Sequence, residues 1–442
     1  MADKKKKKKR GGAKRKMTVE QITAHKSVAE WVSLGHSLKP STAPLVNDVV
    51  VDVHDDDFGL LPNSTTNFLE KFKFEFHSHS ISSDGFLSPS KLVERAHRNG
   101  VKVLSLTDHD TLSGIPEALK AAQKFGIKII PGVEISTIFS PREEQQQPGL
   151  EEPVHILAYY STCGPTKPDV FEKFLSNIRD GRYLRARNML SKLNKLKLPV
   201  RWEQVTRIAG AGVAPGRLHV ARAMVEAGYV ENLKQAFSRY LHDGGPAYSK
   251  GSEPSVEDAL QMICESGGVS VLAHPWALKN PVPIIRRLKD AGLHGIEVYR
   301  SDGKLAVFSD LADAYDLVKL GGSDFHGRGG HGESDMGSVN LPIVAVHEFL
   351  KMARPIWCAS IKNSLEEYTE DPSPSKLEWI MKFGKIKVPN GGCSNNAELV
   401  ELCLSSWFTK EERQNLVFDA LKLKLSKVSF GAKEDIQVPM EI

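Results

Sequence analysis

Short apolar runs alternate with longer amphipathic stretches from about residue 72 onward. Seven of these runs predict β-strands, at residues 72–76, 101–106, 127–131, 154–160, 269–273, 295–299 and 318–321. Helix signals separate most of them; Ser88 and Pro89, for example, form a cap followed by proline at the first helical position. Strands that alternate with helices favour a parallel sheet with right-handed crossovers. We therefore expect an α/β protein, built as a barrel or as a doubly wound sheet.

Two regions do not follow this alternation. Residues 165–250 are helical in pattern and rich in arginine, which predicts a helical insertion. Residues 366–375 are acidic and contain prolines, like a linker, and Thr409 with Glu412 matches a capping box before a helix that runs to Leu425. The predicted organisation is a basic disordered tail (1–18), an N-terminal extension and linker (19–71), a main domain (72–365) and a C-terminal helical extension (366–442).

Composition narrows the class of protein. The chain has 442 residues, 40% of them hydrophobic and 26% charged, which is the balance of a globular protein. No run approaches the eighteen or so consecutive apolar residues of a membrane span, so we expect none. Five cysteines without a CxxC pair argue against a disulfide framework and a cysteine zinc site, and they favour a reducing compartment.

The net charge of +5 comes from one short segment. Residues 1–16 hold ten lysines or arginines and one aspartate, so the remaining chain carries a net charge of −4. Such a block of like charges repels itself and stays disordered. It is typical of a nuclear localisation signal or a weak nucleic-acid tether, although a merely solubilising tail has the same composition. We expect the protein in the nucleus, the cytoplasm or both.

Histidines and carboxylates gather where the predicted strands end, the edge at which parallel α/β folds bind ligands. They are His77, His79 and Asp84 after the first strand, Asp108, His109 and Asp110 after the second, Glu134 after the third, His155 in the fourth, His274 after the fifth, and Asp324 and His326 after the seventh. One strand-end histidine alone is usually structural, but His77 and His79 share a strand face and can address one ion. Imidazole and carboxylate ligands suit Mn²⁺, Zn²⁺ or Fe²⁺, and their number indicates two or three ions.

The motifs that carry these residues resemble those of a known family. In order along residues 72–350, HSH followed by Asp84, TDHDT, GVEIS, LAHP and GGSDFHG are similar to the motif series of the PHP family, the polymerase and histidinol phosphatase metallophosphoesterases. GRLHVARAMVEAGYV and PAYSKG in the insertion resemble one branch, which holds nucleotide phosphatases, 3′,5′-bisphosphate nucleotidases and a 5′-to-3′ exoribonuclease. The resemblance implies a distorted (β/α)7 barrel with a trinuclear metal site. The tail, residues 40–70 and the last hundred residues depart from the bacterial pattern.

The resemblance also implies a role for each candidate. A first metal would be held by His77, His79, Glu134 and Asp324; a second by Glu134, His155 and His274; and a third by Asp84, His109 and His326. The implied catalytic residues are Asp84, His109, Glu134 and Asp324. Only the resemblance raises His155 above a core histidine, since it sits at the beginning of an apolar strand. Asp108 and Asp110 are expected to fix the ligand rings from behind.

These ligands predict hydrolysis of phosphate esters. Two metals can lower the pKa of a shared water, and the resulting hydroxide would attack phosphorus. We expect two or three divalent ions, Mn²⁺ first, and a nucleotide substrate: a 5′-nucleotide, a 3′,5′-bisphosphate, or short 5′-phosphorylated RNA or DNA degraded from its 5′ end. Four side chains of the insertion are expected to contact phosphate, although arginines on helices usually face solvent. They are Arg182, Arg185, Arg217 and His219.

Two other functions use similar sequences. A catalytically inactive barrel could act as a binding module that the basic tail tethers to nucleic acid, but such proteins usually lose metal ligands, and this set is intact. A metal hydrolase of C–N bonds would use similar ligands, but it would normally add a lysine on a strand at the site, and none is suitably placed.

Overall fold

The computed structural model describes residues 17–34, 72–140, 151–303, 306–329, 332–383, 396–414 and 416–427. The basic tail and the predicted linker at 40–70 lie outside the described residues, so the expectations for them stay predictions. None of the described helices combines the length and the apolar character that a membrane span requires.

Seven strands form one mixed sheet in the order in which they occur along the chain. They are β1 (Lys73–Glu75), β2 (Val101–Leu106), β3 (Lys128–Phe139), β4 (Glu152–Tyr159), β5 (Val269–Leu272), β6 (Gly295–Glu297) and β7 (Val318–Leu320). A parallel bridge between Ser78 and Phe325 joins the segments that follow β1 and β7, so the two edges of the curved sheet meet there. All seven predicted strands are present, and the α/β half-barrel agrees with the expected distorted barrel.

Strand β4 runs antiparallel to both neighbours, β3 and β5, so the expectation of a wholly parallel sheet is wrong at this strand. A parallel pair needs a crossover connection, usually a helix, and the polar sequence between β3 and β4 has no helical pattern. The reversed direction of β4 brings its first half, where His155 pairs with Ser136, to the edge of the sheet at which the parallel strands end.

Helices cover both faces of the sheet. Neighbouring residues on each strand point to opposite faces, so Leu104 and Ile129 belong to one core and Val103 and Ile130 to the other. The first core contains α2 (Pro89–Arg98), α3 (Ile115–Phe125), α8 (Val256–Glu265), α9 (Pro281–Asp290) and α10 (Ala306–Ala314). The second core contains the long helix α11 (Ile343–Glu370), which crosses the predicted linker and the boundary placed at 365/366.

The helices at both ends of the chain share the second core with the sheet. They are α1 (Val19–Ser33), α12 (Pro374–Lys382), α13 (Asn396–Ser405) and α15 (Leu416–Ser426); the short α14 (Lys410–Arg413) between the last two has no buried residue. Trp407 contacts Trp31 of α1 and Trp357 of α11, with ring centroids 6.1 and 4.6 Å apart. The buried Lys128 at the start of β3 donates to the carbonyls of Leu34 and Ser406, at 2.9 and 2.7 Å. The predicted capping box is present, but its helix ends at Arg413.

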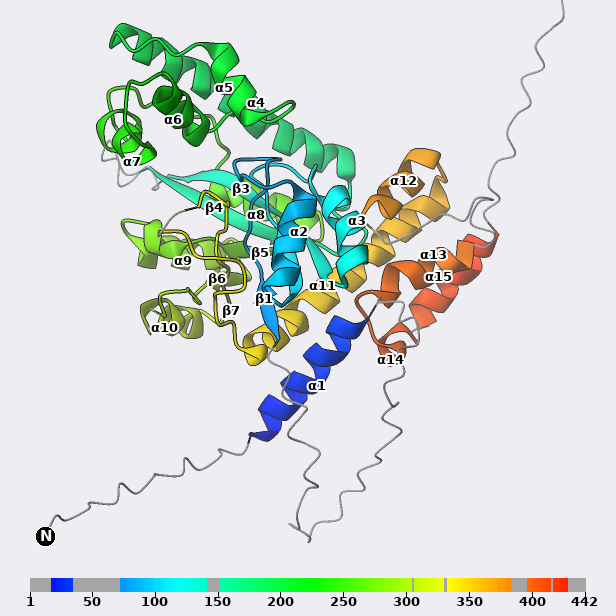
Figure 1. The fold of residues 1–442 in the computed structure, drawn as a ribbon. Helices are drawn as coiled ribbons and strands as arrows, with labels where there is room; N and C mark the ends of the chain where they lie inside the picture. Colours follow the sequence, from blue (N-terminus) through cyan, green and yellow to red (C-terminus); the bar gives the residue numbers. More distant parts are fainter. Residues whose placement is uncertain are drawn as a thin grey trace, which may run out of the picture.

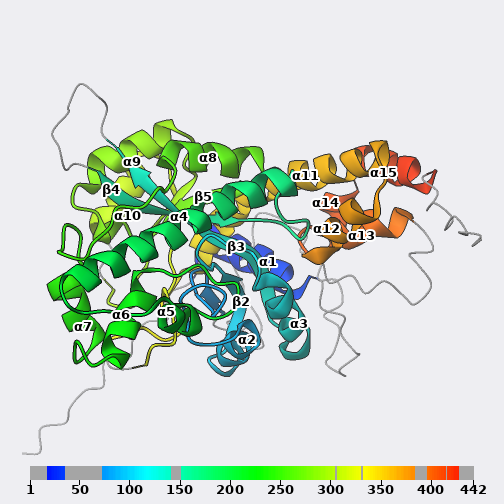
Figure 2. The same cartoon turned by 90° about the horizontal axis from the view of Figure 1, so that it is seen from above.

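The helical insertion consists of α4 (Pro168–Lys195), α5 (Trp202–Ala209), α6 (Arg217–Glu226), α7 (Leu233–Ala236) and a π-helical turn, Phe237–Leu241. The first half of α4 packs on the sheet, because Phe171, Leu175 and Ile178 belong to the first core. From Ala186 onward the apolar side chains form a third core, which includes Met189, Val220 and Met224. This part with α5, α6 and α7 lies at the other end of the molecule from the terminal helices (Figures 1 and 2), against the end of the sheet where the candidate ligands lie.

Candidate metal centre

Glu134 lies at the centre of the predicted ligands, on β3 and only 1% exposed. Its Oε2 atom is 3.1–3.3 Å from ring nitrogens of three histidines, which are His77, His79 and His109. Its Oε1 atom is 2.9 Å from Nδ1 of His155 and 3.0 Å from Nε2 of His274. The two oxygens of one carboxylate thus face two different sets of imidazoles, as a bridging ligand would.

The ligand-type atoms form three groups, in each of which the atoms lie within 4.8 Å of one another. The groups are His77, His79, Glu134 and Asp324; His109, Glu134 and His155; and His79, Asp84, His109 and His326. The first is the set expected for the first metal. The second has His109 where the expectation had His274, although His274 contacts the same oxygen of Glu134. The third adds His79 to the expected set.

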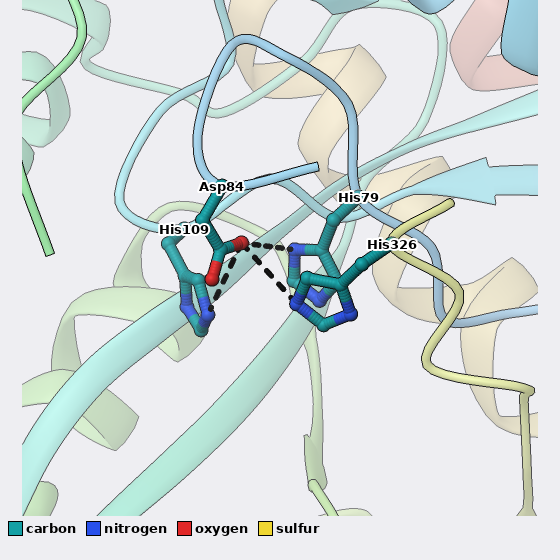
Figure 3. Close-up of side chains that lie close together, drawn as sticks. All are labelled: His79, Asp84, His109 and His326. Carbon is teal, nitrogen blue, oxygen red and sulfur yellow. Dashed lines mark ion pairs between the residues drawn. The ribbon is translucent and has the colours of Figure 1, made fainter. Parts of the chain in front are cut away.

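Asp84 is the common partner in the third group (Figure 3). Its Oδ1 atom lies 3.2 Å from Nε2 of His326 and 3.9 Å from the nearest ring nitrogens of His79 and His109. The three rings come from the segments after β1, β2 and β7, so this group forms only when both edges of the sheet are in place.

Asp108 and Asp110 do not contact the ligand rings, contrary to the expectation. Asp108 accepts hydrogen bonds from Ser80 and Ser83, which fixes the loop between His79 and Asp84. Asp110 accepts from the backbone N and the hydroxyl of Ser136 on β3 and binds an arginine of the insertion. A buried carboxylate binds the nearest hydrogen-bond donors, and for these two aspartates the nearest donors are serines of adjacent loops and strands.

Two buried glutamates that the sequence analysis missed support the site instead. Glu297, at the end of β6, contacts the ring of His77. Glu75, on β1, accepts hydrogen bonds from the backbone N and hydroxyl of Ser323 and from Gly337, which shapes the segment that carries Asp324. The available signal was a glutamate inside an otherwise largely apolar strand, in FKFEF and GIEVY, because a buried charge needs partners.

Several buried polar atoms at the site lie near charged groups but make no hydrogen bond within the protein. Among the described residues, both ring nitrogens of His79, Oδ1 of Asp84 and Nδ1 of His109 are buried and make no hydrogen bond. Buried polar atoms are normally paired, and these lie in the groups described above. Unsatisfied lone pairs on imidazole and carboxylate are what divalent transition-metal ions bind. The residues present therefore fit a cluster of metal ions.

Charges in the cluster shift its pKa values strongly. Burial alone would raise the pKa of Glu134, but His109, His77 and His155 outweigh it and hold that pKa well below its usual range. Burial would lower the pKa of His79, yet Asp324 and Glu134 raise it to about 10. Nearby carboxylates also raise the pKa values of His77 and His274, whereas burial holds the pKa of His109 well below its usual range. Without metal, protons on His77, His79 and His274 balance the carboxylates. Metal binding near neutral pH therefore has to release protons.

All four predicted substrate side chains line hollows beside these ligands. A cavity of about 220 Å³ is lined by Arg182, Arg185 and Arg217 together with His109 and His155. Ion pairs hold the arginines in place. Arg182 binds Asp110 at 2.6 Å, Arg185 binds Glu253 at 2.7 Å, and Arg217 binds Asp243 at 2.5 Å.

A second, smaller hollow of about 20 Å³ is lined by His219 with Asp84, His109 and Arg179. Burial, with help from Arg222 and Arg182, lowers the pKa of His219 to about 4. The ring is therefore neutral at pH 7. The backbone N of Gly216 donates to its Nδ1 at 2.9 Å, so the ring hydrogen is on Nε2.

The sequence analysis missed two cationic side chains at these hollows. Arg179 lies one helical turn before Arg182, a spacing that puts both on one face of α4, and it donates to the carbonyl of Asp110 at 2.8 Å. Arg328, in the loop after β7, lines the larger cavity and is exposed. The first could have been found from its helical spacing; the second had no such signal.

Comparison with known proteins agrees with this geometry. The model of the PHP domain matches residues 75–267. The chain is 35% identical over 261 residues to a 5′-3′ exoribonuclease of Haemophilus influenzae, which covers 58% of this chain and 90% of that protein. It is 32% identical over 290 residues to a 3′,5′-nucleoside bisphosphate phosphatase of Chromobacterium violaceum, covering 64% of this chain and 94% of the relative.

Solved structures give the same result. A protein of Bifidobacterium adolescentis described as a metal-dependent phosphoesterase matches with a TM-score of 0.55 and 27% identity, over 63% of this chain and 96% of that one. A Chromobacterium violaceum protein described as an amidohydrolase, with bound sulfate, matches with a TM-score of 0.53 and 32% identity, over 61% and 93% of the two chains. This chain belongs to the PHP family.

Proposed function

We propose that this chain hydrolyses phosphate esters of nucleotides with the help of bound metal ions, acting on nucleoside 3′,5′-bisphosphates, 5′-nucleotides and short 5′-phosphorylated RNA or DNA. One observation carries the proposal. Buried imidazole and carboxylate atoms without partners meet at one edge of the sheet, and arginine-lined hollows open beside them. The relatives named as an exoribonuclease and a bisphosphate phosphatase support nucleotides as the substrate class.

Two or three divalent ions, Mn²⁺ first, are the proposed cofactors. The proposed ligands are the eight residues of the three groups together with His274, which contacts Glu134: His77, His79, Asp84, His109, Glu134, His155, His274, Asp324 and His326. When bound, such ions supply a water of lowered pKa and positive charge for the phosphate oxygens. The protein holds Glu134 between two sets of imidazoles, so that this one carboxylate would serve two neighbouring ions.

The insertion supplies the phosphate contacts in this proposal. Arg182 is held by both Asp110 and Ser136, so its charge is fixed beside the ligands and does not need to reorganise during reaction. His219 presents a neutral N–H donor in the smaller hollow. Arg185 and Arg217, on the wall of the larger cavity, are placed for a second phosphate or a phosphodiester. Pairing with Glu253 and Asp243 keeps them extended.

The two alternative functions have less support. No lysine lines either hollow among the described residues. The buried strand lysine, Lys128, is bound to the terminal helices instead, at the start of β3. This disfavours the C–N hydrolase. The inactive barrel predicts lost ligands, whereas all nine candidates are present and lie at one edge of the sheet.

A phosphate-release screen with Mn²⁺ tests the substrate class. The panel is 5′-AMP, 3′-phospho-AMP, histidinol phosphate, a sugar phosphate and a short 5′-phosphorylated oligonucleotide. We expect the nucleotides and the oligonucleotide to be cleaved best. Faster turnover of histidinol phosphate or the sugar phosphate would refute the assignment. Bound metal without release of phosphate or of mononucleotides from any substrate would favour the inactive barrel.

Replacing one arginine tests its contact with substrate. Arg217→Ala should raise KM and lower kcat, each by about 10-fold, because a contact that tightens in the transition state affects both. Metal content should not change. The matched control is Arg207→Ala, because Arg207 forms an exposed pair with Glu226 on the insertion and lines neither hollow. Equal losses in both variants would contradict the assigned contact.

Elemental analysis tests the metal cluster. We expect two to three ions per chain, and Glu134→Gln should lose more bound metal than His155→Ala, since Glu134 faces two sets of imidazoles. An active enzyme with at most one ion per chain would contradict the proposed cluster.

A further inference from the structure

Strand β6 ends at Glu297 and contributes none of the proposed metal ligands. Its glutamate side chain is nevertheless 2% exposed, at the carboxyl edge of the sheet behind the ligand histidines. A buried carboxylate is costly unless donors satisfy both of its oxygens. The donors that satisfy Glu297 belong to two of the proposed ligand residues.

The first donor is the ring of His77. Oε1 of Glu297 lies 3.1 Å from Nδ1 of His77. Because a carboxylate oxygen can only accept, Nδ1 carries a hydrogen. Nε2 lies 3.2 Å from Oε2 of Glu134 and 3.4 Å from Oδ1 of Asp324, so without metal it donates to these carboxylates, and it is the nitrogen left for a metal ion to bind. Glu297 thus selects the tautomer of His77 that can bind a metal ion.

The second donor is the main chain of His274. Oε2 of Glu297 accepts from its backbone N at 2.7 Å. His274 has φ 30° and ψ 58°, in the left-handed region that residues other than glycine seldom occupy. The hydrogen bond holds this backbone in place, and the ring then reaches Oε1 of Glu134 at 3.0 Å. Glu297 fixes one imidazole through its ring and the other through its main chain.

Resting on the ligand set proposed above, we infer that Glu297 is a positioning residue that couples two neighbouring metal ions. His77 and His274 contact different oxygens of Glu134, so they face the two sides of the bridging carboxylate. The side chain of Glu297, which lies behind both histidines, fixes the orientation of both. Loss of Glu297 should therefore weaken two ions together, although it binds neither.

Glu297→Gln is the sharpest test, because the amide has nearly the shape of the carboxylate but only one acceptor oxygen. If that oxygen accepts from His274, the NH₂ group faces Nδ1 of His77 and favours the wrong tautomer. If the amide is reversed, the NH₂ group meets the backbone N–H of His274. Either orientation therefore releases one imidazole directly, and because both imidazoles contact Glu134, the second ion is weakened through this shared carboxylate.

A matched control lies on β4. Glu152 is also a buried carboxylate, and it accepts from the backbone N of Lys279 in the same loop after β5, at 2.9 Å, without touching a ligand ring. Glu152→Gln should therefore disturb the same loop to a similar degree without changing a tautomer.

The experiment measures metal binding in the full chain by competition with a chelator, using Mn²⁺ alone, and stoichiometry by elemental analysis. Glu297→Gln should weaken two ions by about 10- to 100-fold, the usual effect of losing a hydrogen bond to a ligand imidazole. Glu152→Gln should bind Mn²⁺ like the wild type. At saturating Mn²⁺, kcat of the Glu297→Gln variant should recover to within a few-fold of wild type.

Three results would overturn the inference. They are unchanged Mn²⁺ affinity in Glu297→Gln, equal loss in Glu152→Gln, or normal metal binding with a kcat that saturating Mn²⁺ does not restore. Circular dichroism establishes that each variant is folded; if Glu297→Gln is not, Glu297→Asp, which is one methylene too short to reach both partners, replaces it. A wild-type chain that binds no Mn²⁺ would instead refute the proposed ligand set.

Discussion

The insertion and the terminal helices are attached to the same sheet in opposite ways. The terminal helices share an apolar core with it, through side chains such as Trp31 and Trp407. The first half of α4 shares a core with the sheet as well, but from Ala186 onward the insertion keeps an apolar core of its own and is tied to the sheet by arginines, as between Arg182 and Asp110. Apolar burial stabilises a fold without directional demands, whereas fixed charges set geometry. The terminal helices should therefore govern stability, and the insertion should govern catalysis.

Trp407→Ala should give the largest effect on stability. Removing a fully buried tryptophan costs about 3–5 kcal/mol, and Trp407 stacks between α1 and α11. Because the core is shared, urea unfolding should remain one transition at lower urea, with kcat unchanged at temperatures where the protein is folded. Met224→Ala, in the core of the insertion, is the counterpart and should instead expose residues 165–250 to protease. If the terminal helices of Trp407→Ala unfolded in a separate transition at lower urea, they would not share one cooperative core with the sheet, and the comparison would be wrong.

Arg182→Ala should give the largest effect on catalysis. Loss of one fixed donor beside a reacting phosphate typically lowers kcat/KM by about 10²- to 10³-fold. Steady-state rates on 3′-phospho-AMP and metal content are the measurements, with Arg207→Ala as the control. Full activity in Arg182→Ala would show that the arginines only attach the insertion. Loss of metal with loss of activity would place the effect on the ligands.

The pH dependence of stability should show the burial of His219. Its pKa is about 4 in the folded chain and about 6.5 when unfolded. Between these values the unfolded state binds the proton more readily. Stability supplied by the neutral ring is therefore complete above pH 6.5 and decreases as the pH falls towards 4. At pH 5 the loss is about 2 kcal/mol.

Urea unfolding of metal-free protein at pH 7 and pH 5 measures this loss. His219→Asn keeps an acceptor for the backbone N of Gly216 but cannot titrate, so it should lose about 2 kcal/mol less than the wild type on acidification. Parallel losses in the two proteins would show that His219 takes up its proton without unfolding the insertion.

The smallest effect on catalysis should come from deleting residues 2–16. Their charge of +9 acts on polyanions through counterion release, and residues 17–76 separate them from the first candidate ligand, His77. We expect unchanged turnover of 3′-phospho-AMP, weaker retention on RNA or DNA at low salt, and less protein in the nucleus. A truncated enzyme that keeps its metals but loses mononucleotide activity would show that the tail reaches the site.

The sequence was sufficient for the strands and for the convergence of the ligands. Period-two apolar runs mark the strands, and the chemical type of His77, Glu134 and Asp324 is visible wherever they fold. The direction of β4 was not visible, because strand direction depends on which neighbour pairs with it. His155 therefore looked like a core residue until reversal of its strand brought it to the ligand edge.

Contacts between distant parts of the chain were equally hidden. The sequence around Trp31 does not predict its contact with Trp407. Lys128 joins segments from both ends of the chain to β3, and these contacts exist only when all three segments are folded together. The acidic, proline-bearing stretch at 366–375 is typical of a linker, yet α11 continues to Glu370 because both prolines lie beyond its end. Glu297 was missed for the same reason, since its partners come from two other strands.

The backbone of His274 has a consequence for the evolution of the protein. Asp110 and Asp324 share its positive φ, at 55° and 52°. A left-handed conformation costs most residues about 1–2 kcal/mol relative to glycine. Glycine at any of the three positions would relax the chain and destroy the site. Selection for greater stability alone would therefore replace residues that the enzyme needs for catalysis. The protein keeps these three strained backbone positions because its activity depends on the side chains they carry.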